Sequence, residues 1–253
     1  MGLLRNWRRN KTDRFPFPDH WRDILSDEIP QYVKMDAFKR EKFEKKIRYF
    51  MEEKSFEGCG GMELDDKKKL LIAALACLPL MGDVSDLYPY LRSVLVYPSE
   101  YRAPYRESGV DGVVSEGVES RSGESWDQGV LVFSWDEIAY DLRHPTDGAN
   151  IVFHECAHQL DYEWGATMES FAWQQKPGEP GMASVLKASY QNLLERLESG
   201  SPVRIDDYAA TNIHEFFAVM TETWLERPER IRNDWPEVEK VLSDFYNFKP
   251  DFL

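Results

Sequence analysis

Cysteine is scarce in this sequence, and its scarcity argues against a fold held by disulfide bonds. The 253 residues include only Cys59, Cys77 and Cys156, which form no paired framework. In a chain long enough to bury a core of useful size, this cysteine content is typical of a reducing compartment. We therefore expect a cytoplasmic protein.

The sequence also lacks an excess of positive charge. Its 31 Lys and Arg residues are outnumbered by 45 Asp and Glu residues, which gives a formal net charge of −14. Because a surface that binds nucleic acid must be positive to neutralise phosphates, this balance argues against nucleic acid as the main partner. Cationic peptides or a basic protein partner remain compatible with it.

No apolar run is long enough to cross a membrane. The longest, LLIAALACLPLMG, contains Pro79 and is shorter than the roughly 20 residues that span a bilayer. The basic segment MGLLRNWRRNKTDR is not followed by the apolar part of a signal peptide, and position 6 lacks the Ser or Thr of the myristoylation pattern. We therefore expect no association with a membrane.

Helical and β-rich patterns divide the chain into three parts. Residues from about 20 to 88 are predicted to be helical, including a buried helix, KKKLLIAALACLPL, that ends near Leu78 because Pro79 cannot continue it. Short β-rich stretches follow at 92–97, 112–116 and 129–135. The polar, glycine-rich segments ESGVDG and EGVESRSGESWDQG between them are predicted to be turns or loops.

Helices return after His144 and Pro145. One carries the motif HECAH, and the others are predicted at 182–197, 211–226 and 235–246. The order of helices, a small sheet and further helices predicts an α+β fold.

The segment NIVFHECAHQLDYEWG, residues 150–165, has the residues of a hydrolytic metal site. On a helix, His154 and His158 lie about 40° apart and one turn along, close enough to share one ion. Glu155 borders the same face, about 60° from His158. Two neutral imidazoles and a flanking carboxylate are what a hydrolytic zinc site requires, because zinc lowers the pKa of its water and the carboxylate can take the proton.

The motif is short enough to occur by chance, so its context matters. Asn150 is a good N-cap and is followed by apolar residues, which predicts a buried helix. Cys156 lies about 200° from His154, on the opposite face, and is expected to pack in the core. For Asp161, two alternatives stay open: it accepts the spare N–H of a ligand histidine, or it is a solvated surface acid.

A catalytic zinc needs a third protein ligand. The metzincin pattern would require Gly at 161 and His at 164, and Asp161 and Trp164 exclude it. A carboxylate on a later helix is the remaining common solution, and IDDYAATNIHEFFAVMTETWLERP offers Glu215, Glu222 and Glu226.

Spacing alone does not decide among these carboxylates. Glu215 and Glu222 are seven residues apart and share a helix face, with the small Ala218 between them. Glu215 could instead serve in a helix cap, because Asn212 lies three residues before it. His214, about 100° round the helix, is a weaker rival as a ligand.

Three motifs in order, SGESWDQGVLVFSWDEI, HECAHQLD and DDYAATNIHEFFAV, resemble the Mlc titration factor A family, the glucose-regulated zinc metallopeptidases of the gluzincin type. The resemblance covers roughly residues 15–246. It implies a single zincin-like metallopeptidase domain over 1–253, with a helical N-terminal part at 1–88 and a zinc-binding catalytic part at 89–253. In that core a small mixed sheet is flanked by helices.

The resemblance also implies the roles of individual residues. It makes His154, His158 and Glu215 the ligands of one Zn²⁺ per chain, and Glu155 the general base. It assigns Tyr208, in DDYAA, to the site as a donor that stabilises the oxyanion.

Two positions depart from the family pattern. Cys156 stands where an aromatic residue is usual inside HExxH, and His214 stands where a small residue is more frequent. Neither departure removes a ligand.

The resemblance implies hydrolysis of short peptides, aminopeptidase-like in the best-known members, and in some members binding and inactivation of a transcriptional repressor of glucose uptake. Two hypotheses are therefore a zinc peptidase and a regulatory protein that sequesters such a repressor, with a secondary zinc site. A third, with less support, is a zinc hydrolase of non-peptide amides.

The strand GVLVFSWDE is expected at the sheet edge, where a peptide can add as a further strand, or else in the sheet interior. The loop WGATMESFAWQQKPGEPG is expected to be a lid or a passive connector.

Overall fold

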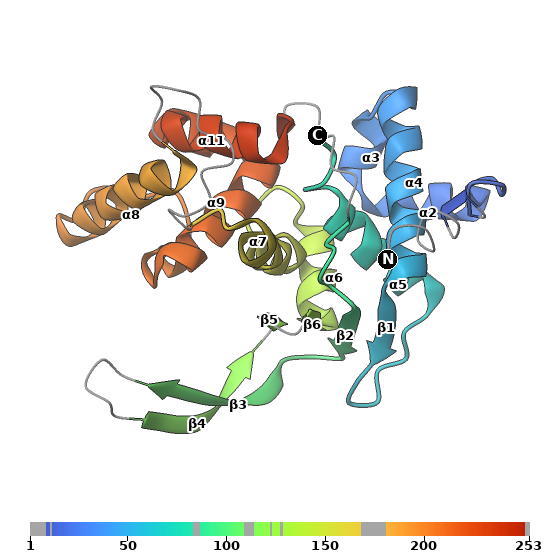
Figure 1. Cartoon of the computed structure of the whole chain (residues 1–253), viewed down its shortest axis with the longest axis horizontal. Coiled ribbons are helices and arrows are strands. Elements are labelled where there is room, and N and C mark those ends of the chain that lie inside the picture. Colours follow the sequence, from blue (N-terminus) through green and yellow to red (C-terminus); the bar gives the residue numbers. More distant parts are fainter. Residues whose placement is uncertain are drawn as a thin grey trace.

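The computed structural model describes residues 9–10, 12–82, 87–108, 114–121, 123–126, 129–167 and 181–250. Figure 1 shows the N-terminal helices on one side of the molecule and the C-terminal helices on the other, with helix α7 between them and a small sheet below it. The largest cluster of buried apolar side chains includes residues from all three parts. The α+β prediction is confirmed.

The N-terminal helices are α2 (Asp19–Glu28), α3 (Pro30–Lys34), α4 (Ala37–Glu53) and α5 (Asp66–Cys77). The side chains of Asp36 and Asp65 accept backbone N–H groups at the first turns of α4 and α5, which are the N-caps of these helices. As predicted, α5 is buried and ends beside Leu78. Among the described residues, no helix is both long and apolar enough to cross a membrane.

The main sheet consists of β1 (Ser55–Gly58), β2 (Ser93–Tyr97), β5 (Gly123–Trp126) and β6 (Val130–Ser134), in the order β1-β2-β6-β5. The first three strands in this order are parallel, and β5 is antiparallel to β6. One expectation is therefore wrong: the part at 1–88 is not wholly helical, because it supplies β1. Of the two alternatives for the strand GVLVFSWDE, the interior one is correct, because β6 pairs with both β2 and β5, and the described edges are β1 and β5.

A second correction concerns the polar segment between β2 and β6. Strands β3 (Tyr101–Ser108) and β4 (Val114–Arg121) form a two-stranded antiparallel sheet that extends away from the main sheet in Figure 1. The predicted loop at 116–129 thus includes the end of β4 and all of β5. Strand pairing relies on backbone hydrogen bonds, so a polar sequence without an apolar alternation can still form it.

The C-terminal part contains α6 (Trp135–Arg143), α7 (Ile151–Trp164), α8 (Met182–Glu198), the short helix η1 (Asp207–Ala210), α9 (Ile213–Glu226), α10 (Pro228–Asp234) and α11 (Pro236–Tyr246). Besides the short η1, two of these helices were not expected. The first, α6, follows β6 without a loop, and the Ser134 side chain caps it. The second, α10, starts at Pro228, which ends α9 and is tolerated in the first turn of the next helix.

Candidate metal site

Helix α7 carries the HECAH motif, and both of its ends are capped. The Asn150 side chain accepts the N–H of Phe153 at 3.2 Å, as the sequence predicted for an N-cap. At the other end, Gly165 has a φ of 64° and donates its N–H to the Asp161 carbonyl at 2.7 Å. Between the caps, His154, Glu155 and Cys156 are buried.

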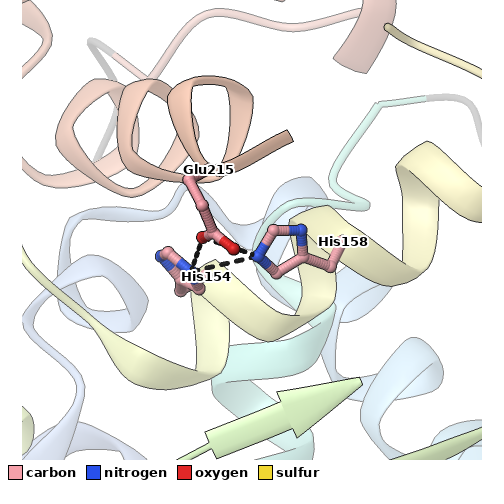
Figure 2. Close-up of side chains that lie close together, drawn as sticks. All are labelled: His154, His158 and Glu215. Carbon is pink, nitrogen blue, oxygen red and sulfur yellow. Dashed lines mark hydrogen bonds and ion pairs between the residues drawn. The ribbon is translucent and has the colours of Figure 1, made fainter. Parts of the chain in front are cut away.

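Helix α9 brings a carboxylate to the same place. The Asn212 side chain accepts the N–H groups of His214 at 2.9 Å and Glu215 at 3.0 Å, and so caps the helix. The Glu215 side chain points toward the imidazoles of α7 (Figure 2). Helices α7 and α9 pack against each other, and the small Ala218 is fully buried.

Three donor atoms from His154, His158 and Glu215 form a compact triangle (Figure 2). The Glu215 Oε2 atom lies 3.0 Å from His154 Nε2 and 3.1 Å from His158 Nε2, and the two Nε2 atoms are 3.1 Å apart. In a tetrahedral zinc site with bonds of about 2.0–2.1 Å, ligand atoms are about 3.3–3.4 Å from one another. The donor set and its spacing therefore fit a zinc ion after a small expansion.

Glu222 orients one of these imidazoles from behind. Its Oε1 atom lies 3.2 Å from His154 Nδ1, and its Oε2 atom accepts the N–H of Asn150 at 2.8 Å. A proton on Nδ1 directed at this carboxylate leaves the Nε2 lone pair facing the triangle. The sequence placed Glu222 on the face of Glu215 as a rival ligand, and it did not reveal this second contact with Asn150.

Glu226, the third candidate carboxylate, serves the backbone. It accepts the Gly148 N–H at 3.1 Å and the Asn150 side-chain N–H at 3.3 Å, at the start of α7. Burial raises the pKa of Glu226 to about 8. Among the described residues, neither it nor Glu222 belongs to the group that could hold an ion.

The triangle attracts positive charge. Burial by itself would lower the pKa of His154, but hydrogen bonds with Glu215 and Glu222 outweigh it and raise this pKa well above its ordinary value. Burial would raise the pKa of Glu215, but the two imidazoles outweigh it and lower this pKa to about 2. The buried carboxylate of Glu222 and the partly buried one of Glu215 thus stabilise a cation at the two imidazoles, whether a proton or a metal ion.

Asp161 and His214 form a separate pair beside the triangle. Asp161 matches neither of its two alternatives: it is buried and so not a solvated acid, and its Oδ2 atom lies 2.7 Å from Nδ1 of His214, a histidine outside the triangle. It also accepts the backbone N–H of Thr167 at 2.8 Å. This pair joins the end of α7 to the start of α9, and among the described residues His214 lies outside the ligand group.

Three further residues that the sequence singled out lie on η1 and α7. Tyr208, on η1, is 52% exposed, and its ring centroid is 6.0 Å from that of His154. Glu155 follows His154 on α7 and is buried. Cys156 packs in the core, as expected, and burial raises its pKa to about 12. The segment 168–180, which contains most of the expected lid, lies outside the described residues.

Known proteins resemble this sequence over nearly the whole chain. The family model described as glucose-regulated metallo-peptidase M90 matches residues 4–247. An uncharacterised protein of Synechocystis sp. is 38% identical over 246 residues, which cover 97% of this chain and 90% of that protein. Mlc titration factor A of Salmonella schwarzengrund is 28% identical over 232 residues, covering 91% and 86%. The corresponding protein of Cronobacter sakazakii is 28% identical over 247 residues, covering 96% and 91%.

Proposed function

The chain belongs to the glucose-regulated metallo-peptidase M90 family, and from this premise we propose that it is a zinc-dependent peptidase with a single zincin-like domain. The observation that carries the proposal is the triangle of His154, His158 and Glu215, with its separations of 3.0–3.1 Å. A single domain is supported by the pairing of β1, from the N-terminal part, with β2.

We propose separate roles for the residues around the ion. Zinc held by the triangle would supply a Lewis acid that polarises the scissile carbonyl and acidifies a water molecule. Glu155, next to His154 on α7, would accept the proton of that water and pass it to the leaving amine. Tyr208, exposed beside the His154 ring, would donate a hydrogen bond to the oxyanion that develops on the carbonyl.

An extended peptide has an edge to bind along. Strand β5 packs against α7, and one of its edges pairs with β6. In the described main sheet no strand pairs with its other edge. Backbone hydrogen bonds from that edge would hold a peptide beside the triangle, which is the role the sequence had suggested for β6.

The direct test is metal analysis combined with turnover. We expect one zinc per chain in the purified protein, hydrolysis of a panel of aminoacyl p-nitroanilides and short peptides, and loss of hydrolysis on chelation that added zinc restores. Stoichiometric zinc without hydrolysis of any member of the panel would contradict a peptidase and favour the binding function described below.

Replacing Tyr208 by Phe should affect the transition state more than the bound substrate. The variant lacks only the phenolic donor, so we expect kcat to fall roughly 10²-fold, by analogy with other oxyanion donors, while KM changes little. Steady-state kinetics with zinc content measured in parallel would show this. An unchanged kcat would remove Tyr208 from the proposed mechanism.

A second candidate function follows from the relatives named Mlc titration factor A. The chain could bind a transcriptional regulator of the Mlc type, with the zinc site secondary to that binding. Size-exclusion chromatography with purified Mlc would test it, and the Glu155→Gln variant would show whether such a complex forms without turnover.

A further inference from the structure

Two exposed tyrosine rings contact each other near the last turn of α7. Tyr162, on α7, is 50% exposed and Tyr90, in the segment before β2, is 61% exposed. Their ring centroids are 6.4 Å apart in an edge-to-face arrangement. Such a pair presents apolar surface to an incoming group, because neither ring is covered by the protein's own core.

The segment that carries Tyr90 is held firmly. The Tyr90 N–H donates to Glu163 Oε1 at 3.0 Å. The buried ammonium of Lys54 donates to the carbonyls of Tyr88 at 2.7 Å and Leu91 at 2.9 Å. A Cβ atom at Gly129 would lie only 2.1 Å from the Tyr90 carbonyl oxygen, so the backbone before β6 packs closely against this segment. The backbone that carries Tyr90 is therefore fixed, which reduces the entropy lost when a ligand orders the pair.

Helix geometry places this pair on the substrate side of the triangle. Tyr162 comes four residues after His158, about 6 Å further along α7. It comes seven residues after Glu155, so the two side chains leave the helix within about 20° of each other. Because side chains of a helix lean toward its N-terminus, the Tyr162 ring lies closer to the level of His158 than its Cα does.

The direction of β5 decides which part of a peptide would reach the pair. Trp126, at the end of β5, pairs with Val130, which directly follows Gly129. The Gly129 backbone lies against the Tyr90 segment, where its carbonyl accepts the Arg92 N–H at 2.8 Å, so this end of β5 lies near the tyrosines. A peptide that adds antiparallel to β5, the slightly more stable arrangement, would begin at this end and run toward Gly123. Its residues N-terminal to the scissile bond would then lie level with the tyrosines along the strand direction, where the Tyr162 ring projects from α7.

We propose that Tyr90 and Tyr162 form a subsite for a large apolar side chain on the N-terminal side of the scissile bond. This subsite rests on the proposed peptidase function and names its substrate class, which is peptides with an aromatic or large aliphatic residue at that position. The edge of one ring and the face of the other would enclose the side chain, and the ion would fix the adjoining carbonyl.

The test measures binding without turnover. Amino-acid hydroxamates bind zinc through the hydroxamate and carry one side chain on the N-terminal side of the carbonyl. We expect the zinc-loaded protein to bind phenylalanine hydroxamate about 10-fold more tightly than alanine hydroxamate in calorimetry. Tyr162→Ala should remove most of this preference, and Tyr162→Phe, which retains the ring, should preserve it.

A matched control is Tyr140→Ala. Tyr140 is 48% exposed, but it lies on α6 and its ring contacts that of His144, so its loss should leave the ratio of the two dissociation constants unchanged. An unchanged ratio in Tyr162→Ala, or equal binding of both hydroxamates by the zinc-loaded wild type, would overturn the subsite alone. A protein that takes up no zinc would overturn the proposed function and the subsite with it, and zinc analysis before titration separates these outcomes.

Discussion

A Glu155→Gln variant should bind zinc normally and lose nearly all peptide hydrolysis. Glutamine has almost the shape of glutamate but cannot accept a proton from the attacking water. General-base catalysis contributes on the order of 10²–10⁴ in rate, so kcat should fall by that factor. The measurement is steady-state hydrolysis of one peptide substrate, with zinc content determined on the same samples.

Two comparisons make this result interpretable. Glu198→Gln makes the same chemical change at an exposed position at the end of α8, and should keep the wild-type rate. Zinc content and melting temperature should be the same in both variants and the wild type. Hydrolysis by Glu155→Gln at the wild-type rate would show that the activity comes from a contaminant or another site, and would refute the role proposed for HECAH.

The second large effect should follow the loss of a ligand. His158→Ala removes one of the three donor atoms, so we expect loss of stoichiometric zinc together with the stability that zinc provides. A ligand that binds only the folded state stabilises it by about 2.7 kcal/mol at a free concentration 100 times its Kd. Thermal unfolding with and without added zinc should therefore show a shift for the wild type and none for His158→Ala.

The control for this experiment is His144→Ala, which removes an exposed histidine outside the triangle. This variant should keep its zinc and its zinc-dependent shift. The His158→Ala variant should also melt close to the zinc-free wild type, because both lack the same stabilisation. Stoichiometric zinc in His158→Ala would mean that the ion is held elsewhere.

Local patterns in the sequence were sufficient to predict helices α5 and α7. The apolar run of α5 and the Asn150 cap of α7 gave correct helices, because capping and helical periodicity are decided within a few residues. The unexpected strand β1 depends on a distant partner. Ser55 of β1 pairs with Ser93 of β2, and nothing near residue 55 encodes that pairing.

The candidate site divides in the same way. The relation between His154 and His158 follows from helix geometry alone. The choice among Glu215, Glu222 and Glu226 depends on how α9 packs against α7, which spacing within either helix does not determine. The structure gives each carboxylate different contacts. Glu215 faces the imidazoles, and Glu222 contacts His154 and Asn150. Glu226 accepts a backbone N–H before α7.

The long separation between α7 and α9 has a consequence for the protein's synthesis. Glu215 follows His154 by 61 residues, so at about 5–20 residues per second a ribosome needs roughly 3–12 s to add the third donor after the first. Through that interval the nascent chain contains HECAH without Glu215 or the carboxylate of Glu222 that orients His154. A site with all three donors therefore cannot assemble before Glu215 has been added, and until then the nascent chain lacks the zinc site proposed above.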